Sequence, residues 1–364
     1  MLLNGDEKMR AWLEINLENL VYNIKKIQND LPNRKVIAVV KADSYGMGAV
    51  KISKTLVERC GIDFFAVATL EEGIELRENG IKENILILGG IFNEELEIAS
   101  KYNLHIALTS MAQLIYIKEH NIDIKCHMKI ETGMGRVGFN EVEVCEVKKY
   151  VKENNIKNIV GLYTHLSVSD EPGEDNKLYT ENQIKKFNEF DGIDTIEYRH
   201  ILNSGGILNY SGQDNGNYVR AGIIQYGVCC GKMIEGYKPV FTFKSRVLFL
   251  KELLKDNDIS YGRTANLKKG TTVATISAGY ADGFRREISN RGSVTINGVE
   301  CRVVGKVCMD MFMVEVPEKL KEKISVGDEV ILYGDDIADK AQLINISVYE
   351  LFTGIGKRVK RVYI

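Results

Sequence analysis

Short apolar runs alternate with amphipathic segments through the first two thirds of the chain. Continuous apolar runs of this length are typical of strands that are buried on both faces. Eight such runs are predicted as strands: 36–41, 64–68, 84–88, 105–109, 125–130, 158–164, 198–202 and 218–223. Apolar residues at helical spacing, first from Leu17 to Ile27 and again from near Ala49, separate most of these strands.

Strands that alternate with helices fit either a doubly wound sheet or a closed barrel. Eight strands, with no glycine fingerprint after the first, favour an α/β fold with a (β/α)8 TIM-type barrel. After about residue 236 the pattern changes to short strands and turns, including a hairpin signal at Asn297-Gly298. We therefore expect a barrel over 1–236 and a mostly β domain over 237–364, with residues from about 8–15 pairing with the second domain.

Composition excludes several classes of protein. The chain has 364 residues, which fits two domains of about 150 residues each, and 45% hydrophobic residues argue against disorder. A formal net charge of −2 gives no reason to expect nucleic acid as a partner. No apolar run approaches the roughly 18–20 residues of a membrane span, and no secretory signal is evident. The seven cysteines form no C-x-x-C pair, so no zinc site or disulfide framework is indicated, and we expect a cytoplasmic protein.

Reactive side chains gather at the ends of the predicted strands, where barrels of this type carry their active sites. The residues at five strand ends are Lys41, Lys129 with Arg136, His165, Asn203 with Ser204-Gly205-Gly206, and Arg220 with Gly222. A single strand-end lysine is usually only a solvated side chain. Five polar strand ends at one mouth are hard to obtain by chance, so we expect an active site there.

The chemistry of this mouth can be narrowed further. Ser204 and the Gly222-Ile223 pair offer a hydroxyl and backbone N–H groups after the last two strands, the usual phosphate corner of such barrels. Taken alone, each of these loops reads as an ordinary glycine turn. Lys41 leaves an apolar strand, and desolvation there lowers the pKa of a lysine and makes it a nucleophile toward carbonyls. Together, a lysine and a phosphate corner suggest pyridoxal phosphate held as a Schiff base.

Eight motifs then resemble those of the alanine racemase family, in the same order and nearly from end to end. They are VVKADSYGMGAV (39–50), KIETGMGRVGF (129–139), THLSVSDE (164–171), ILNSGG (201–206), RAGIIQYG (220–227), ISYGRT (259–264), AGYADGF (278–284) and GKVCMDM (305–311). The related fold type III decarboxylases do not carry SYGRT and VCMDM in this arrangement. A small single-domain pyridoxal-phosphate-binding protein of the same group lacks the second domain.

The resemblance implies a pyridoxal-phosphate-dependent racemase that interconverts L- and D-alanine and supplies D-alanine for peptidoglycan. Two bases would act on opposite faces of the substrate Cα: Lys41, which also holds the cofactor, and Tyr261. In the family this tyrosine comes from the second subunit of a homodimer, so the active site is shared. A free tyrosine has a pKa near 10, and Arg136 and His165 are the neighbours expected to lower it.

The same resemblance assigns the remaining site residues. Arg220 would face the pyridine nitrogen, and His165 would orient Arg220. The residues expected around the phosphate and the cofactor are Tyr45, Asn203, Ser204, Gly222 and Ile223. The residues expected at the substrate are Arg136 and Met309, which receive its carboxylate, and Tyr280, which limits its size at the entrance. Lys129 aligns with a lysine that is carbamylated in some members.

Three positions depart from the family's usual motifs: Met47 replaces a histidine, Ala221 replaces a proline, and Lys357 stands where some members carry a tyrosine. These changes keep further substrates open, namely serine, ornithine or lysine. Asp170 and Glu171 are near enough in sequence to serve a basic substrate. A fold type III decarboxylase and a non-catalytic pyridoxal-phosphate carrier also stay open, although a carrier has no need of Tyr261.

Overall fold

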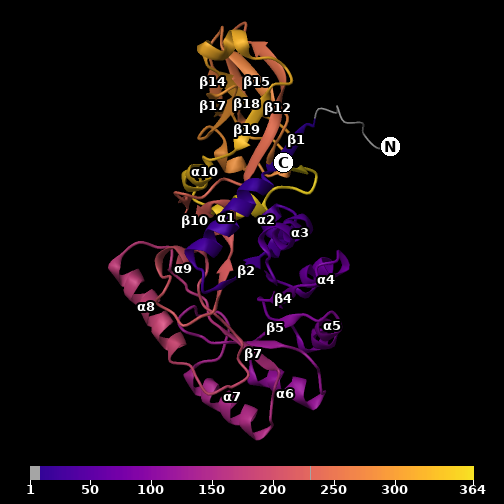
Figure 1. Ribbon diagram of the computed structural model, residues 1–364. Helices are drawn as coiled ribbons and strands as arrows, with labels where there is room; N and C mark the ends of the chain where they lie inside the picture. The colour runs from indigo at the N-terminus through magenta and orange to yellow at the C-terminus, as the bar shows by residue number, and fades with distance from the viewer. Residues whose placement is uncertain (1–8, 230) are drawn as a thin grey trace. The chain divides into compact units, whose positions relative to one another are not determined.

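The computed structural model describes residues 9–229 and 231–364. The chain divides into two compact units, Val21–Cys230 and Met1–Leu20 with Gly231–Ile364, called here the barrel unit and the β unit (Figure 1). The boundary falls within helix α1 (Leu17–Asp30). Lys8, where the segment expected to pair with the second domain begins, lies outside the described residues.

The barrel unit contains a closed barrel of eight parallel strands. Each predicted apolar run forms one strand, and most of the strand residues are buried. The strands are β2 (Lys35–Val39), β3 (Phe64–Val67), β4 (Asn84–Ile87), β5 (His105–Leu108), β6 (Cys126–Lys129), β7 (Ile159–Tyr163), β8 (Tyr198–His200) and β9 (Tyr218–Ala221). β9 returns to β2, with Lys35 opposite Tyr218 and Ala38 opposite Ala221, which closes the barrel.

Figure 1 shows helices around the outside of these strands. They are α3 (Ala49–Cys60), α4 (Leu70–Glu78), α5 (Leu96–Lys101), α6 (Met111–Glu119), α7 (Glu141–Glu153) and α8 (Glu174–Asn188). Polar caps start several of them: Thr69 accepts from the N–H of Glu72, and Asn140 accepts from the N–H of Glu143. Short helical segments follow three strands, namely α2 (Lys41–Gly46), α9 (Ser204–Asn209) and η2 (Ile223–Tyr226).

The β unit is built on an eight-stranded sheet in the order β15-β18-β17-β16-β19-β12-β1-β20, with β15 also pairing with β12. The strands are β1 (Ala11–Ile15), β12 (Phe241–Glu252), β15 (Thr272–Ile276), β16 (Ser293–Ile296), β17 (Val299–Val304), β18 (Phe312–Val316), β19 (Glu329–Tyr333) and β20 (Lys360–Tyr363). Two helices, α10 (Ile337–Leu343) and α11 (Val348–Thr353), precede β20. β1 joins this sheet because it pairs antiparallel with β12 and parallel with β20.

The predicted fold class, a TIM-type barrel followed by a mostly β region, is confirmed. The Asn297-Gly298 hairpin is also present, because both residues have positive φ and connect β16 to β17. Within the described ranges, no helix combines the length and the apolar character that crossing a membrane requires.

Candidate active site

Lys41 follows β2 directly and begins a turn with unusual backbone geometry. The four residues after it, Ala42 to Tyr45, all have left-handed angles, with φ between 52° and 57°. A left-handed residue other than glycine costs about 1–2 kcal/mol, so this turn is strained. Strain of this kind persists where the surrounding structure enforces it, and it clusters at functional sites.

A carboxylate and a hydroxyl hold the strained turn in place. Glu72 accepts from the N–H of Ala42 at 2.7 Å and from the N–H of Ala68 at 2.7 Å, so it ties the turn to the end of β3. At the other end, the Ser44 hydroxyl lies 2.6 Å from the Tyr226 hydroxyl in the buried core. Sequence analysis missed Glu72 and Tyr226, since both act by contacts with residues that are distant in sequence.

The Lys41 amine lies in a site that disfavours its charge. Burial is the main cause of its lowered pKa, and the guanidinium groups of Arg136 and Arg220 add to the effect. Glu72 acts in the other direction. A lowered pKa increases the fraction of neutral amine, which is the form that attacks carbonyls and accepts protons.

Arg220 on β9 is almost fully buried and has most of its hydrogens engaged. Its Nη1 donates to His200 Nδ1 at 2.9 Å and to the His200 carbonyl at 2.8 Å. Its Nη2 donates to the carbonyls of Thr164 and Ile201 at 2.8 and 3.0 Å and lies 3.3 Å from His165 Nδ1. Burial lowers the pKa of Arg220 to about 10, which leaves it a cation at neutral pH. The expected contact between His165 and Arg220 is therefore present.

The predicted phosphate corner converges on Gly222. A Cβ placed on this glycine would lie 2.9 Å from the Tyr45 hydroxyl and 3.2 Å from Ser204 Oγ, so both hydroxyls face its bare backbone. Ile223 follows as the first residue of η2, whose leading N–H groups have no partner within the helix. Asn203 organises this loop by accepting from the Gly206 N–H at 2.9 Å and donating to the Leu166 carbonyl at 3.1 Å.

Lys129 and Arg136 lie on and after β6. Lys129 is buried, and its amine donates to the Val137 carbonyl at 2.8 Å. Burial lowers the pKa of Lys129 to about 8, with Glu131 raising it and Arg136 lowering it further. Arg136 is exposed. The two cations are thus close enough to repel each other, as expected from their spacing in sequence.

Tyr261, Tyr280 and Met309 belong to the β unit, where hydrogen bonds join the three loops that carry them. Tyr261 stands at the tip between β13 (Asn257–Ile259) and β14 (Ala265–Leu267), and it is 71% exposed. The neighbouring Ser260 hydroxyl donates to the Lys306 carbonyl at 2.6 Å, just before Met309. Tyr280 in turn donates its N–H to the Cys308 carbonyl at 3.0 Å.

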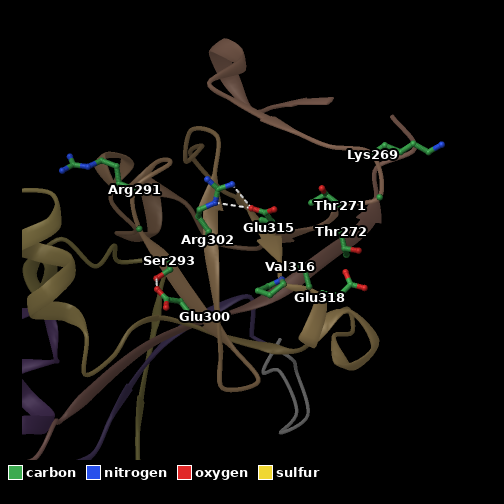
Figure 2. A pocket seen from close by; sticks show the side chains of 13 residues that line it. Lys269, Thr271, Thr272, Arg291, Ser293, Glu300, Arg302, Glu315, Val316 and Glu318 are labelled. Carbon is green, nitrogen blue, oxygen red and sulfur yellow. Dashed lines mark hydrogen bonds and ion pairs between the residues drawn. The ribbon is translucent and has the colours of Figure 1, made fainter. Parts of the chain in front are cut away.

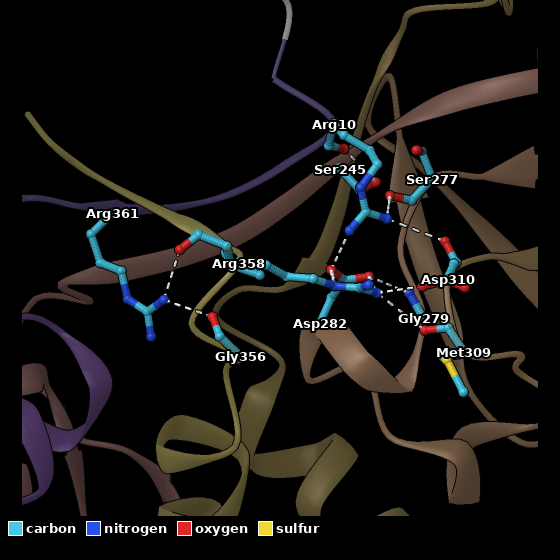
Figure 3. Close-up of polar contacts among 11 residues, drawn as sticks. Arg10, Ser245, Ser277, Gly279, Asp282, Met309, Asp310, Gly356, Arg358 and Arg361 are labelled. Carbon is cyan, nitrogen blue, oxygen red and sulfur yellow. Dashed lines mark hydrogen bonds and ion pairs between the residues drawn. The ribbon is translucent and has the colours of Figure 1, made fainter.

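Asp282 holds the loops of Tyr280 and Met309 together (Figure 3). Its buried carboxylate pairs with Arg10 and with Arg358, and it accepts from the Gly279 N–H at 2.8 Å. Arg358 also pairs with Asp310 at 2.8 Å. Three segments distant in sequence therefore meet at one carboxylate, and this positions Tyr280 and Met309 through their backbones. Sequence analysis did not find Asp282, because neither arginine is near it in sequence.

An open hollow of about 770 Å³ elsewhere in the β unit contains none of the predicted site residues. Charged side chains that line it already pair with neighbours, such as Arg302 with Glu315 at 2.7 Å (Figure 2).

Two family models match nearly the whole chain. The alanine racemase N-terminal domain matches residues 15–229, and the alanine racemase C-terminal domain matches residues 240–363. The chain belongs to the alanine racemase family. The resemblance seen in the sequence motifs is confirmed, and so is the prediction of an enzyme of the racemase class.

Individual relatives agree with this family over their full length. An alanine racemase of Fusobacterium nucleatum is 42% identical over 98% of this chain and 100% of its own. One of Halothermothrix orenii is 38% identical over 97% and 96%. A solved alanine racemase of E. faecalis superposes with a TM-score of 0.88 at 29% identity and covers both chains completely. One of Bartonella henselae, solved with covalently bound pyridoxal phosphate, has a TM-score of 0.87 at 27% identity over 98% of this chain and 100% of its own.

Proposed function

We propose that this member of the alanine racemase family interconverts L- and D-alanine with pyridoxal phosphate as cofactor. The observation that carries the proposal is the strained turn, which begins at the half-buried, pKa-lowered Lys41 and ends near Tyr45, whose hydroxyl faces Gly222. In a family of racemases, a reactive lysine together with a phosphate-binding loop is best explained as a site for pyridoxal phosphate.

The residues present fit pyridoxal phosphate. Gly222 leaves room where a side chain would crowd Tyr45 and Ser204, so an anion can approach the backbone there. Lys41 supplies the amine for the cofactor's carbonyl group. When bound, the cofactor supplies an electron sink for the negative charge that develops at the substrate Cα.

Two bases are needed because a proton leaves one face of Cα and arrives on the other. We assign Nζ of Lys41 to one face and Oη of Tyr261 of the partner subunit to the other. Tyr261 is 71% exposed in one chain, so we expect the cationic and hydrogen-bonding neighbours that would stabilise its ionised form to come from a second copy. This exposure supports a homodimer with shared sites.

His165 is suited to stabilise an ionised Tyr261 by donating a hydrogen bond to its oxygen. Arg220 can only donate hydrogen bonds, so His165 Nδ1 accepts from it and the histidine hydrogen resides on Nε2. Burial and the nearby cations lower the pKa of His165 well below its ordinary value, which keeps this ring neutral. A neutral ring with hydrogen on Nε2 donates to a tyrosine oxygen and stabilises its ionised form.

Arg220 limits how strongly the cofactor withdraws electrons. Its pKa of about 10 is far above that of a pyridine nitrogen, so it donates a hydrogen bond there and keeps its proton. We propose that this restraint favours return of the proton to Cα over side reactions.

Arg136 and Met309 are proposed to receive the substrate carboxylate, with Tyr280 at the entrance. The cofactor-binding set remains Lys41, Tyr45, His165, Asn203, Ser204, Arg220, Gly222 and Ile223. We further propose a cytoplasmic enzyme that supplies D-alanine for peptidoglycan.

Chiral chromatography of the purified protein with added pyridoxal phosphate tests the proposal. L-alanine, L-serine, L-lysine and L-ornithine are offered in parallel, and D-alanine should form fastest. Preference for serine or a diamino acid would keep the racemase and reject alanine as its substrate. Absence of every D-isomer despite a bound cofactor would reject racemisation in favour of a decarboxylase or a carrier.

A further inference from the structure

Three histidines that the proposed reaction does not use lie inside the barrel in a continuous row. His105 on β5, His127 on β6 and His200 on β8 are at most 1% exposed. His105 Nδ1 lies 3.0 Å from His127 Nε2, and His127 Nδ1 lies 2.8 Å from His200 Nε2. The row ends at Arg220, whose Nη1 is 2.9 Å from His200 Nδ1.

The direction of every hydrogen bond in this row follows from Arg220. A guanidinium has donors only, so His200 Nδ1 must accept and the hydrogen of His200 must be on Nε2. That hydrogen is donated to His127 Nδ1, which places the His127 hydrogen on Nε2. His127 then donates to His105 Nδ1, so all three rings share one tautomer.

A second protonation of any ring would break the row. It would set two N–H groups against each other, or an N–H against Arg220. Burial lowers the pKa of His105 to about 3 and that of His127 and His200 well below the ordinary value, with Lys125, Arg77 and Arg220 contributing. The three rings are therefore neutral and each has one donor and one acceptor.

The barrel is shaped around this row. A Cβ on Gly161 of β7 would lie 2.3 Å from His127 Nδ1, so only glycine leaves room for the ring. Tyr163 on the same strand stacks on His200 with centroids 4.9 Å apart and planes 14° apart. Phe64 meets His105 and His127 edge-on, at centroid distances of 5.3 and 5.7 Å.

The row also leaves one part of Arg220 uncommitted. Of the contacts in the described part of the chain, Nη1 and Nη2 make all the hydrogen bonds of this side chain, and Nε makes none. Pinning both Nη groups fixes the rotation of the guanidinium plane and so the direction of the Nε hydrogen.

We infer that His200, His127 and His105 form a directional hydrogen-bond chain that positions Arg220, with Nε–H as the donor left for the ring nitrogen of the cofactor. The three are positioning residues, since none contacts the cofactor in this assignment. The inference rests on the proposed function only for what Arg220 contacts. The order of the chain itself is independent of it.

Histidine tautomers give a test that needs no catalysis. Long-range ¹H–¹⁵N spectra of the full-length protein labelled at its 5 histidines separate the two tautomers, with or without added cofactor. We expect the Nε2–H form at all three positions. The Nδ1–H form, or a mixture of the two, at His200 would overturn the inference.

A matched pair of variants tests the consequence for Arg220. In His127→Gln the amide can accept from His200 and donate to His105, whereas His127→Leu can do neither. We expect the leucine variant to lose the single His200 tautomer, to shift the visible absorption of the bound cofactor and to slow racemisation about tenfold, as when an outer hydrogen-bond partner is removed. The glutamine variant and His120→Gln, at an exposed histidine, should match the wild type in absorption and rate.

Other outcomes separate this inference from the proposed function. An unchanged His200 tautomer and cofactor spectrum in His127→Leu would overturn the chain while leaving the racemase intact. The expected tautomers in a protein that neither binds the cofactor nor racemises would support the chain and reject the proposed function. If the leucine variant fails to fold, the wild-type tautomers and the glutamine variant still decide.

Discussion

The candidate site residues of the barrel unit are mostly buried or half-buried, with Arg136 exposed, whereas those of the β unit are all exposed. In the barrel unit Arg220, Tyr45 and Ser204 are 2%, 4% and 5% exposed. In the β unit Tyr261, Met309 and Tyr280 are 71%, 53% and 43% exposed. The first group is part of a packed core, while the second stands on the surface of its own unit.

The backbones behind the exposed group are nevertheless well held. Ser260 bonds to the Lys306 carbonyl beside Tyr261, and Asp282 joins the loops of Tyr280 and Met309. Loops whose backbones are already fixed add little ordering cost when a surface covers them, because only the side chains remain to be ordered. The β unit is thus prepared for a partner, which supports the shared site that we propose for two copies.

Mixing two inactive variants, one altered in each unit, is the strongest test of a site shared between two copies. Lys41→Ala removes the barrel base and should lower the racemisation rate on the order of 10⁴-fold or more, because it takes out the centre of a catalytic unit. Tyr261→Phe removes the base on the other face of Cα and should slow exchange of the Cα proton with solvent more for one enantiomer of alanine than for the other. If sites are shared, mixed dimers contain one intact site, and random pairing restores about one quarter of the wild-type sites.

Subunit exchange followed by the chiral assay measures this recovery. The unmixed variants, treated identically, are the controls. No recovery in mixtures that mass spectrometry shows to contain mixed dimers would place both bases in the same chain. Equal slowing of Cα proton exchange for both enantiomers in Tyr261→Phe, followed by NMR in deuterated water, would count against two separate bases.

The strand pattern predicted the barrel because burial on both faces leaves continuous apolar runs. The strand ends then predicted Lys41, Lys129, His165 and Arg220, since parallel strands of a barrel share one mouth. The left-handed turn could not be predicted, because Ala42 to Tyr45 contain no glycine to announce positive φ.

Polar contacts between residues distant in sequence could not be predicted either. The three barrel histidines are separated by 22 and 73 residues, and they meet only because their strands face one interior. Asp282 pairs with Arg10, which is 272 residues away in sequence, and with Arg358, which is 76 residues away. Local periodicity contains no information on such pairs, so the sequence predicted candidate reactive residues but not the contacts that hold them.

A smaller effect is expected from a substitution that affects the barrel unit alone. In Gly222→Ala the new methyl group would crowd the Tyr45 hydroxyl at 2.9 Å and Ser204 Oγ at 3.2 Å. We expect cofactor affinity to fall by about 10–100-fold, the range for displacing a positioning group by about 1 Å.

Fluorescence titration with pyridoxal phosphate measures that affinity. Gly334→Ala is the matched control, because its new methyl group meets only Ile331 Cγ2 at 3.2 Å, the end of a flexible side chain. Unchanged affinity in the Gly222 variant would show that the phosphate does not bind there.

A third substitution, at Asp282, should affect the β unit alone. Burial opposes ionisation of Asp282, but hydrogen bonds from Arg358, Arg10 and the Gly279 N–H outweigh it and lower its pKa. Asp282→Asn should therefore cost about 1–2 kcal/mol of unfolding free energy, a buried-pair loss reduced because the arginines are 40% and 42% exposed. Loosening of the Tyr280 and Met309 loops should raise KM for alanine about tenfold with little change in cofactor affinity.

The pH dependence of this variant has a defined sign. A lowered carboxyl pKa contributes stability above the unfolded value of about 3.9 and loses it as pH falls through the folded value. Urea unfolding should thus show the full difference between wild type and Asp282→Asn above about pH 5, shrinking on acidification. A difference that grows with acid would contradict an ionised Asp282.

The smallest expected effect on racemisation is that of Lys129, a buried lysine whose charged neighbour Arg136 is exposed. Carbon dioxide adds to a neutral amine with release of one proton, and burial lowers the Lys129 pKa to about 8, so this amine is partly neutral near that pH. The carbamate would turn repulsion with Arg136 into attraction. Since Arg136 is exposed, the pair is worth about 0.2–1 kcal/mol, and Lys129→Ala should slow racemisation less than about fivefold.

Carbon-13 NMR with labelled carbon dioxide should show one carbamate signal, which grows with pH at fixed dissolved carbon dioxide because the neutral fraction grows. Acetate should restore part of the lost rate in Lys129→Ala by supplying a carboxylate near Arg136. Lys125→Ala, at an exposed lysine just before the same strand, is the control and should lose neither signal nor rate. A signal that survives Lys129→Ala would place the modification elsewhere and leave Lys129 as a plain amine bonded to the Val137 carbonyl.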